Sequence, residues 1–286
     1  MTETEAWEER MSRQIAAYHE SALLYAAVKL GLPDRLAGEA RTAEQLAADL
    51  GLSTPHLDRF LHGLVNLGVC EERPDRTFAL TQGGQSLRSG TRLNEKVQIV
   101  VGQYWQPWAA LVSCLKTGKP AFDQVFGMSV RDWRKRNAEQ GALFDSYLAR
   151  ERPGQSDLIA EALDLSEGKS IANVDAQNAI QTDAELYVMN RVLQTLDDES
   201  ARATLVDCRK AMPDTAKLLI IERLMPENAV DDEATVMLDL HMMVITGGRL
   251  RTLAEMKALL TQAGLALAKV SPIRDGLTML IAGGLK

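Results

Sequence analysis

Four polar side chains in the C-terminal half carry most of the chemistry that this 286-residue chain could perform. Asn190 and Gln194 end in amides, which hydrogen-bond carbonyl groups. Glu222 could carry a proton, and His241 is the only histidine in that half of the sequence. Such groups could orient and polarise a bound molecule, and Asn190, Gln194, Glu222 and His241 are the candidate catalytic residues.

No residue spacing in the sequence predicts a metal site. The three cysteines lie far apart and are odd in number, and the four histidines are not paired at ligand spacing. Thiols without a disulfide framework are typical of a reducing compartment. The first residues, Met1–Arg10, are acidic and do not resemble a signal peptide. We therefore expect a cytoplasmic protein without a metal ion.

Charge and hydropathy argue against two kinds of partner. The formal net charge is −7, whereas a nucleic-acid binder neutralises phosphates with an excess of basic side chains. No apolar run approaches the roughly 18 residues that cross a bilayer. The 46% of apolar and 25% of charged residues are ordinary for a globular protein. We expect neither nucleic acid nor membrane as a partner.

Residues 91–165 are expected to be mostly helical and hold much of the aromatic content. An aromatic wall is typical of a pocket for an aromatic molecule. Rings at helical spacing also fill ordinary cores, and the sequence leaves both interpretations open. The basic run Arg131–Arg136 is expected to be a solvated face. The predicted substrate-binding residues of this segment are Trp105, Trp108, Phe122, Phe126, Trp133 and Phe144.

Residues 1–90 have the pattern of a winged helix. Thr42 is a suitable N-cap and Gly51 a suitable end for a short helix, and Ser53 is a suitable cap for the next one. Helix, turn, helix and β-wing together define the winged-helix module. The expected elements are helices over 11–31, 43–50 and 54–67 and strands over 69–73 and 77–81.

A winged helix binds DNA or serves as a dimerisation scaffold. Residues 1–90 hold 13 acidic and 9 basic side chains, and the second helix carries Arg59 as its single fixed positive charge. Base reading normally needs basic contacts to phosphate. The charge balance therefore favours dimerisation over DNA binding.

The C-terminal part alternates strands with helices but contains a short spacing. The apolar runs Ile171–Val174 and Leu186–Met189 have the length of strands, and only ten residues, Asp175 to Ala184, separate them. A parallel crossover with its helix needs about a dozen residues or more. The further elements expected are strands over 185–190, 217–223, 265–270 and 277–282 and helices over 198–212, 228–245 and 252–263.

Several segments resemble the S-adenosylmethionine (SAM)-dependent small-molecule O-methyltransferases of bacterial polyketide tailoring and plant phenol metabolism. The C-terminal ones are LYVMNRVLQTLDDESARATLVDCRKAMP, KLLIIERLMPE and MLDLHMMVITGGRLRTLAEMKALLTQAGL. SALLYAAVKLGLPDRL, TAEQLAADLGL and LTQGGQSLRS resemble the dimerisation domain of that family, and GKPAFDQVFG resembles the loop before its substrate helices. The resemblance covers nearly the whole chain in order. It implies a homodimer that acts on an aromatic small molecule.

The chain departs from the family pattern at two places. The first strand of the family ends in a glycine-rich turn against SAM, but no glycine occurs here between Gly168 and Gly247, and about two βα units have no counterpart. Gln194 stands where the family has a catalytic histidine, and a neutral amide is no base near pH 7. Glu222 matches an acidic residue that often assists the histidine, and His241 and Met242 match the helix that lines the substrate pocket.

These departures lead to one main hypothesis and several alternatives. Because binding a micromolar cofactor needs about 8 kcal/mol, loss of the glycine-rich turn predicts no SAM site and no other cofactor. The main hypothesis is a tailoring enzyme that cyclises, isomerises, rearranges or couples a polyketide-like aromatic without SAM, having lost methyl transfer. The alternatives are a SAM-dependent O-methyltransferase with an atypical cofactor site, and a non-catalytic metabolite-binding or partner subunit.

The expected fold is mainly α with an α/β part, in three domains. Residues 1–90 would form the winged-helix dimerisation domain, residues 91–165 the helical substrate-pocket segment, and residues 166–286 a truncated Rossmann-like methyltransferase domain.

Overall fold

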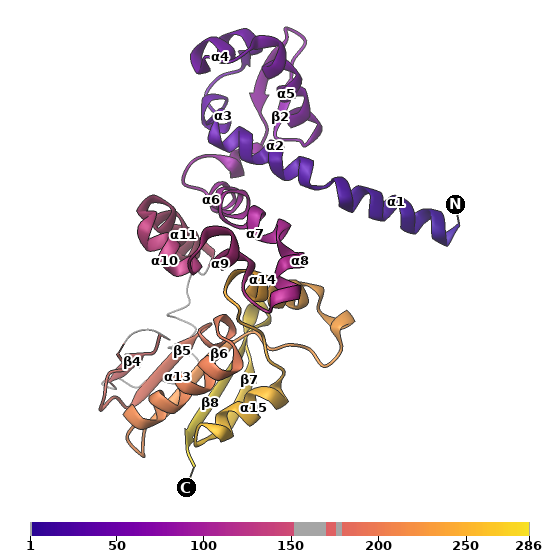
Figure 1. Ribbon diagram of the computed structural model, residues 1–286. Helices are drawn as coiled ribbons and strands as arrows, with labels where there is room; N and C mark the ends of the chain where they lie inside the picture. The colour runs from indigo at the N-terminus through magenta and orange to yellow at the C-terminus, as the bar shows by residue number, and fades with distance from the viewer. Residues whose placement is uncertain (1, 152–169, 176–178, 286) are drawn as a thin grey trace. The chain divides into compact units, whose positions relative to one another are not determined.

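The structure is a computed structural model that describes residues 2–151, 170–175 and 179–285 (Figure 1). The chain forms two compact units. The N-terminal unit holds residues 1–105 and 134–153, and the C-terminal unit holds residues 106–133 and 154–286. The aromatic-rich segment 91–165 is therefore divided between the units.

The N-terminal unit is helical with one small antiparallel sheet, of strand order β1-β3-β2. A π-helical turn, η2, directly follows one of its helices, α6. The elements are α1 (Glu3–Ala16), α2 (Tyr18–Lys29), α3 (Leu32–Arg35), β1 (Arg41–Thr42), α4 (Ala43–Leu50), α5 (Thr54–Asn66), β2 (Cys70–Glu72), β3 (Thr77–Leu80), η1 (Gly84–Leu87), α6 (Arg92–Ile99), η2 (Val100–Tyr104) and α11 (Ala138–Glu151).

Local signals build the winged helix as the sequence predicts. The Thr42 side chain accepts a hydrogen bond from the Gln45 backbone and the Gln45 side chain accepts one from the Thr42 backbone, so α4 begins with a capping box. Gly51 ends α4 with φ of 65°. Ser53 precedes α5 but bonds the His56 ring instead of the helix backbone. The apolar face of α5 is buried in the core of the module.

The expected single helix over 11–31 is two helices in the structure. A capping box between Thr2 and Glu5 starts α1 earlier than the apolar pattern suggests. At Ala17 the hydrogen bonds tighten, because Ala17 N donates to Gln14 O and Glu20 N donates to Ala17 O. This three-residue spacing separates α1 from α2, which ends before Gly31.

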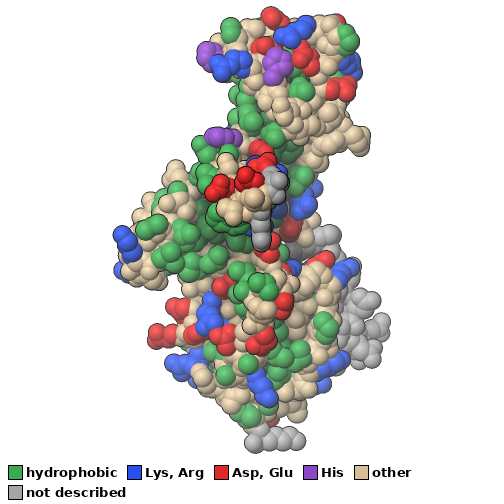
Figure 2. Space-filling model, turned by 90° about the vertical axis from the view of Figure 1, so that its right-hand side faces the viewer, with side chains coloured by type: hydrophobic (Ala, Val, Ile, Leu, Met, Phe, Trp, Pro, Cys, Tyr) green, Lys and Arg blue, Asp and Glu red, His purple; other side chains and the backbone are tan. Residues whose placement is uncertain are grey.

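Ion pairs join the β-wing to α5. Arg76 of the wing contacts Asp58 of α5 and Glu72 of β2, and the His62 ring lies 3.1 Å from Glu72. Figure 2 shows acidic and basic side chains interspersed on the winged-helix part of the face in view. The basic side chains on this side of the module thus have acidic neighbours, as the charge balance of the sequence suggests.

The C-terminal unit holds the larger sheet, of strand order β4-β5-β6-β8-β7. Short helices precede it, two of which, α7 and α10, cross the boundary between the units. The elements are α7 (Trp105–Ala109), α8 (Leu111–Thr117), α9 (Ala121–Phe126), α10 (Val130–Arg136), β4 (Ile171–Asn173), β5 (Leu186–Asn190), η3 (Leu193–Thr195), α13 (Asp198–Ala211), β6 (Lys217–Glu222), η4 (Ala229–Asp231), α14 (Glu233–Ile245), α15 (Leu253–Gln262), β7 (Leu265–Pro272), η5 (Arg274–Gly276) and β8 (Thr278–Gly284).

Strands β4 and β5 pair directly despite the short spacing between them. They run parallel, with Ile171 opposite Leu186 and Asn173 opposite Val188. The described residues of their connection, 174–175 and 179–185, contain no helix. Parallel strands usually need a longer crossover, so this connection is compact. Strand β4 forms one edge of the sheet.

The rest of the sheet is mixed. Strands β5 and β6 are parallel, β6 and β8 are antiparallel, and β8 and β7 form a second antiparallel pair with β7 at the far edge. Helices α13 and α15 lie on one face of the sheet (Figure 1). A core of buried residues joins these helices to the sheet, among them Tyr187, Leu205 and Leu260. A second cluster, which includes Val188 and Ile221, occupies the other face.

The observed architecture confirms the predicted fold class, a winged helix followed by helices and an α/β domain. The predicted boundary between residues 165 and 166 lies outside the described residues, so the three-domain division stays a prediction. No helix in the described part of the chain is long and apolar enough to cross a bilayer.

Candidate active site

The ends of two strands place the predicted polar residues on one edge of the sheet. Asn190 is the last residue of β5, opposite Ile221, and Glu222 is the last residue of β6. The 3-10 turn η3 follows β5 and carries Gln194. Open α/β sheets bind ligands at the carboxyl ends of their parallel strands. Three of the four predicted catalytic residues therefore share the edge where a ligand is expected.

The two carboxylate oxygens of Glu222 have different surroundings. Oε1 accepts hydrogen bonds from the backbone N–H of Leu193 at 2.8 Å and of Gln194 at 3.3 Å, whereas Oε2 has no partner among the described residues. Burial raises the pKa of Glu222 from an ordinary 4.5 to about 7, although the two backbone donors lower it. A carboxyl group that titrates near neutral pH can accept and release a proton.

The Gln194 side chain is buried beside Met242. Its Nε2 group lies 3.9 Å from the Met242 sulfur, to which it donates, and its Oε1 atom accepts no hydrogen bond within the described residues. The Oδ1 atom of Asn190 is likewise buried without a partner there. Buried oxygens are normally hydrogen-bonded. With Oε2 of Glu222, three acceptors at this edge suit a ligand that donates hydrogen bonds.

A buried arginine holds the η3 turn in place. Arg251 is 2% exposed, and its guanidinium donates to the carbonyls of Leu193 at 2.8 Å and Leu196 at 3.0 Å. It also donates to Asp198 at 2.9 Å, in the first turn of α13. Five donors in a fixed planar fork allow one side chain to bind all three groups. Arg251 therefore fixes the turn that carries Gln194 and contacts Glu222.

The segment before Arg251 packs against the same turn without space for a side chain. A Cβ atom on Gly248 would lie 2.3 Å from the Gln194 carbonyl oxygen. Leu250 N donates to Asp239 of α14 at 2.7 Å, and Met225 N donates to Arg251 O at 2.9 Å. Because Gly248 has no side chain, its segment can pack directly against the η3 turn. The neighbouring residues then bond to α14 and to the segment after β6.

The fourth predicted catalytic residue contacts an aromatic residue of the predicted pocket. Trp108 Nε1 donates to Nδ1 of His241 at 3.2 Å. The ring centroids are 6.2 Å apart and the planes differ by 21°. Both side chains are half-buried, on α7 and α14. His241 precedes Met242 on α14, so one helix presents both residues that the family resemblance assigns to the pocket.

Three more predicted pocket residues form one aromatic cluster. The centroid of Phe122 lies 4.6 Å from that of Phe126 and 5.8 Å from that of Trp133, and the last two are 5.3 Å apart. Phe122 is fully buried, whereas Phe126 and Trp133 are half-buried. Phe122 is therefore core, and only the other two rings keep surface for a ligand.

Trp105 and Phe144 belong to the N-terminal unit. The Trp105 ring meets the edge of Tyr18 at 6.2 Å. The Arg134 guanidinium lies 3.3 Å from the centroid of Phe144 and donates to the hydroxyl group of Tyr104 at 2.7 Å. The expectation that the run Arg131–Arg136 forms one solvated face is therefore wrong at Arg134, because this side chain is stacked and hydrogen-bonded.

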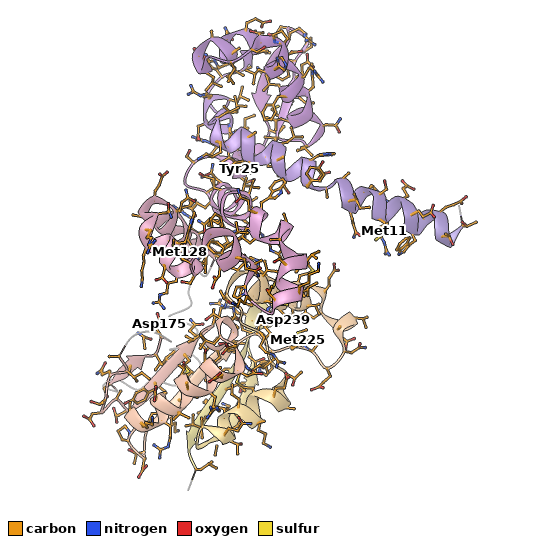
Figure 3. All side chains as sticks on the ribbon, in the orientation of Figure 1. Met11, Tyr25, Met128, Asp175, Met225 and Asp239 are labelled. Carbon is orange, nitrogen blue, oxygen red and sulfur yellow. The ribbon has the colours of Figure 1, made fainter. Side chains whose placement is uncertain are left out.

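The carboxyl end of β4 has a different construction. Asp175, labelled in Figure 3, follows this strand and accepts two hydrogen bonds from Arg131 of α10, at 3.1 and 3.0 Å. The two side chains are 46% and 37% exposed. Within the described residues, no group of three or more histidine, cysteine or acidic side chains could hold a metal ion.

Two family models match the chain and together cover more than half of it. An O-methyltransferase dimerisation domain matches residues 12–89, and an O-methyltransferase domain matches residues 176–266. The chain belongs to this family of O-methyltransferases. The N-terminal match assigns the winged helix to dimerisation, as the sequence analysis expects.

Known relatives match the chain over nearly its full length. It is 27% identical to phenazine O-methyltransferase PhzM of Lysobacter antibioticus, over 94% of each chain. The structure of LaPhzM matches with a TM-score of 0.85 at 26% identity, over 98% of this chain and 99% of that one. NcsB1 of neocarzinostatin biosynthesis, in complex with S-adenosylhomocysteine (SAH) and 1,4-dihydroxy-2-naphthoic acid, matches with a TM-score of 0.77 at 23% identity, over 93% and 96%.

The alignment with PhzM is longer than this chain, which bears on the βα units missing from its sheet. It spans 322 positions but holds only 94% of this 286-residue chain, which is about 269 residues. About fifty aligned positions therefore have no residue here. This difference agrees with the absence of two βα units from the sequence.

The comparisons correct the predicted reaction and cofactor. The relatives carry the names of methyltransferases, and solved neighbours hold SAM or SAH. The hypothesis of a reaction without SAM is thus wrong, and so is the prediction of no cofactor.

The described residues agree with SAM in chemical character. SAM is a cation with amine and hydroxyl donors, and this edge presents the carboxylate of Asp175 and the unpartnered oxygen of Asn190. Carboxylates stabilise a nearby positive charge, and buried acceptors require donors. The acceptor set therefore fits this cofactor, although no glycine-rich turn contributes to it.

Sequence analysis missed the residues that hold this edge together. Arg251, Gly248 and Arg131 carry no motif, and each acts through a partner at least 44 positions away. The one available signal was the run Gly247–Thr252, in which two glycines and two arginines precede a helix cap.

Proposed function

We propose that this chain is a SAM-dependent methyltransferase that transfers a methyl group to a hydroxyl group of an aromatic secondary metabolite. The observation that carries the proposal is the buried carboxyl group of Glu222, with one unpartnered oxygen, at the carboxyl edge of an O-methyltransferase sheet. The matched relatives and the character of the acceptor oxygens support SAM as the methyl donor.

Asp175 and Asn190 would hold SAM at the ends of β4 and β5. When bound, SAM supplies an electrophilic methyl group. Asp175 offers carboxylate oxygens and Asn190 a buried acceptor oxygen to the amine and hydroxyl donors of SAM. The ion pair with Arg131 keeps the Asp175 carboxylate in position.

Glu222 would accept the proton of the substrate hydroxyl group. The usual catalytic histidine is replaced by Gln194, whose amide cannot take this role. Glu222 lies under the same turn, and its Oε2 atom is free of the backbone donors that bind Oε1. With a pKa of about 7 it is partly ionised at neutral pH, as a general base should be. Gln194 would orient the hydroxyl group.

An aromatic substrate would lie against the half-buried rings and Met242. Trp108, Phe126 and Trp133 offer flat apolar surface, and Met242 adapts its shape to a ligand. Phe122 supports the rings from the core. Trp105 and Phe144 remain predicted pocket residues in the N-terminal unit.

The protein would act as a homodimer through residues 12–89, with no nucleic acid or membrane as partner. The match to a dimerisation domain supports this assembly. Light scattering on the purified chain tests it, and a monomer at micromolar concentration would contradict it.

Calorimetry with SAM and with SAH tests the proposed function most directly. We expect binding near the micromolar range, equivalent to about 8 kcal/mol. Transfer of a labelled methyl group to 1,4-dihydroxy-2-naphthoic acid, the ligand bound in NcsB1, is the second measurement. Absence of binding at millimolar SAM would overturn the proposal.

A further inference from the structure

One peptide group connects the two buried charged side chains at this edge of the sheet. The carbonyl oxygen of Leu193 accepts a hydrogen bond from Arg251 Nη1 at 2.8 Å. The N–H group of the same peptide bond, that of Gln194, donates to Glu222 Oε1 at 3.3 Å. The carbonyl and N–H groups of a planar trans peptide point in opposite directions. A partner that fixes the carbonyl group therefore also fixes the direction of the N–H group.

The η3 turn bonds both side chains at a second point. Leu193 N donates to the same Glu222 oxygen at 2.8 Å. Arg251 Nη2 donates to the Leu196 carbonyl oxygen at 3.0 Å. The turn thus presents carbonyl groups to the guanidinium group and N–H groups to the carboxyl group. Glu222 and Arg251 are 1% and 2% exposed, so water competes little for these bonds, and a bonded carbonyl group makes the N–H group of its peptide a stronger donor.

We propose that Arg251 is a positioning residue for Glu222, acting through the Leu193–Gln194 peptide group. Arg251 holds the turn so that both N–H groups stay at Oε1, which leaves Oε2, without a partner among the described residues, to take the proton. Its importance for catalysis rests on the proposed function, in which Glu222 is the general base. Its effect on the carboxyl group needs no substrate and can therefore be measured separately.

The two N–H groups favour the ionised form of the carboxyl group. Burial has the largest effect on the pKa of Glu222 and raises it to about 7, whereas the N–H groups of Gln194 and Leu193 lower it. The charges of Arg251 and Arg191 lower it further. If the turn moves away from Oε1, the pKa of Glu222 should rise, even when every charge is retained.

Other ionisable side chains near the turn have partners of their own. Helix α14 packs against η3, and its Asp239 accepts a hydrogen bond from a backbone N–H group at 2.7 Å. His241 of the same helix accepts one from an indole N–H group at 3.2 Å. Asp198 of α13 is bound to Arg251 itself. The variants R251K and G248A leave these three side chains in place, so a change in the pKa would reflect the position of the turn.

The pKa of Glu222 can be measured in the full chain by unfolding. The wild type and each variant are unfolded between about pH 4 and 9, alone and combined with E222Q. A carboxyl group with a raised pKa loses stability relative to the amide as pH rises toward the folded-state pKa, so the difference becomes constant above that value. In the wild type this should occur above about pH 7.

The R251K variant separates position from charge. Lysine keeps the positive charge but lacks the planar fork that binds both carbonyl groups. We expect the difference to become constant only above about pH 8. The same is expected for G248A, whose methyl group would displace the turn without changing any charge. R249M is the matched control, because the Arg249 side chain shares Asp198 but does not hold the turn, and it should keep the wild-type value.

A wild-type value in R251K together with a raised value in R251M would mean that Arg251 acts by its charge alone, and would overturn the inference. An unchanged value in G248A would also contradict it, and G248A decides if R251K does not fold. As a second readout, the rise of kcat with pH should move upward by the same amount in R251K. Failure of SAM to bind would overturn the proposed function, whereas the unfolding measurements would still decide the role of Arg251.

Discussion

The carboxyl ends of β5 and β4 are neighbours in one sheet but are held by different kinds of interaction. After β5, the η3 turn is bound by a buried carboxyl group and by the buried guanidinium of Arg251. After β4, Asp175 is held by Arg131 in a half-exposed ion pair. Buried polar networks are costly to disrupt, whereas exposed pairs contribute about 0–1 kcal/mol. The first end is therefore expected to be rigid and the second adaptable.

This difference suits the two halves of the proposed reaction. Proton transfer requires Glu222 at a fixed distance from the substrate, so the network around η3 serves positioning. The cofactor side has lost the glycine-rich turn, and there a carboxylate held by a surface contact remains. Variants at the two ends should accordingly differ in the size and in the kind of their effects.

The largest effect is expected for E222Q. The amide keeps an acceptor for the Leu193 and Gln194 backbone donors but accepts no proton, so kcat of methyl transfer should fall about 10²- to 10⁴-fold. The wild-type rate should rise with pH through about 7, and the rate of E222Q should lack that rise. E227Q serves as the control, because Glu227 is exposed. A fall in kcat of less than about fivefold in E222Q would show that Glu222 is not the general base.

The R251M variant should lose about 3–5 kcal/mol of the free energy of unfolding. The substitution removes the donor of the Leu193 and Leu196 carbonyls and leaves them buried. R249M is the matched control, because Arg249 contacts the same Asp198 from a 43% exposed position and should lose less than about 1 kcal/mol. Urea unfolding measures the free energy of unfolding of both variants. Equal decreases would show that the buried Arg251 does not stabilise the η3 turn more than an exposed arginine does.

Stability should depend on pH through Glu222. Its pKa is raised in the folded protein, so between about pH 4.5 and 7 the folded state retains a proton that the unfolded state releases. Wild-type stability relative to E222Q should therefore fall as pH rises through this range, by at most about 3 kcal/mol, and stay constant above it. Unfolding at pH 5, 6, 7 and 8 tests this, and a difference that does not change with pH would contradict the buried carboxyl group.

The G248A variant should be destabilised by about 1–3 kcal/mol. The added methyl group would overlap the Gln194 carbonyl oxygen and displace the turn. At Gly38 nothing lies within 4 Å of an added Cβ, so G38A should change stability by less than about 1 kcal/mol. Thermal unfolding compares the two, and a tolerated G248A would show that η3 shifts easily.

The smallest effect is expected for R131Q at the end of β4. The free energy of unfolding should fall by less than about 1 kcal/mol, and salt should reduce the difference further. A double-mutant cycle with D175N isolates the pair. A coupling energy above about 2 kcal/mol would make this end as firmly built as the other and would remove the distinction between them.

Most of the fold could be predicted from local signals in the sequence. Thr42 and Gly51 mark the ends of α4 because capping and positive φ are properties of a few residues. The buried strands β5 and β6 appear as continuous apolar runs. The family resemblance singled out Gln194 and Glu222. Their positions at the ends of strands place them on one edge of the sheet. The pairing of β4 with β5 could not be predicted, because a short connection leaves open whether strands meet.

The sequence by itself determined the family, the order of the elements and the chemical types at the site. These follow from hydrophobic periodicity, capping residues and side-chain inventory, which act over a few positions. Only the tertiary structure decided the state of those side chains. Burial raises the pKa of Glu222, Arg251 binds a turn more than fifty positions away, and Trp108 donates a hydrogen bond to His241 on α14. Each is a contact between distant segments, and contacts of that kind exist only once the chain has folded.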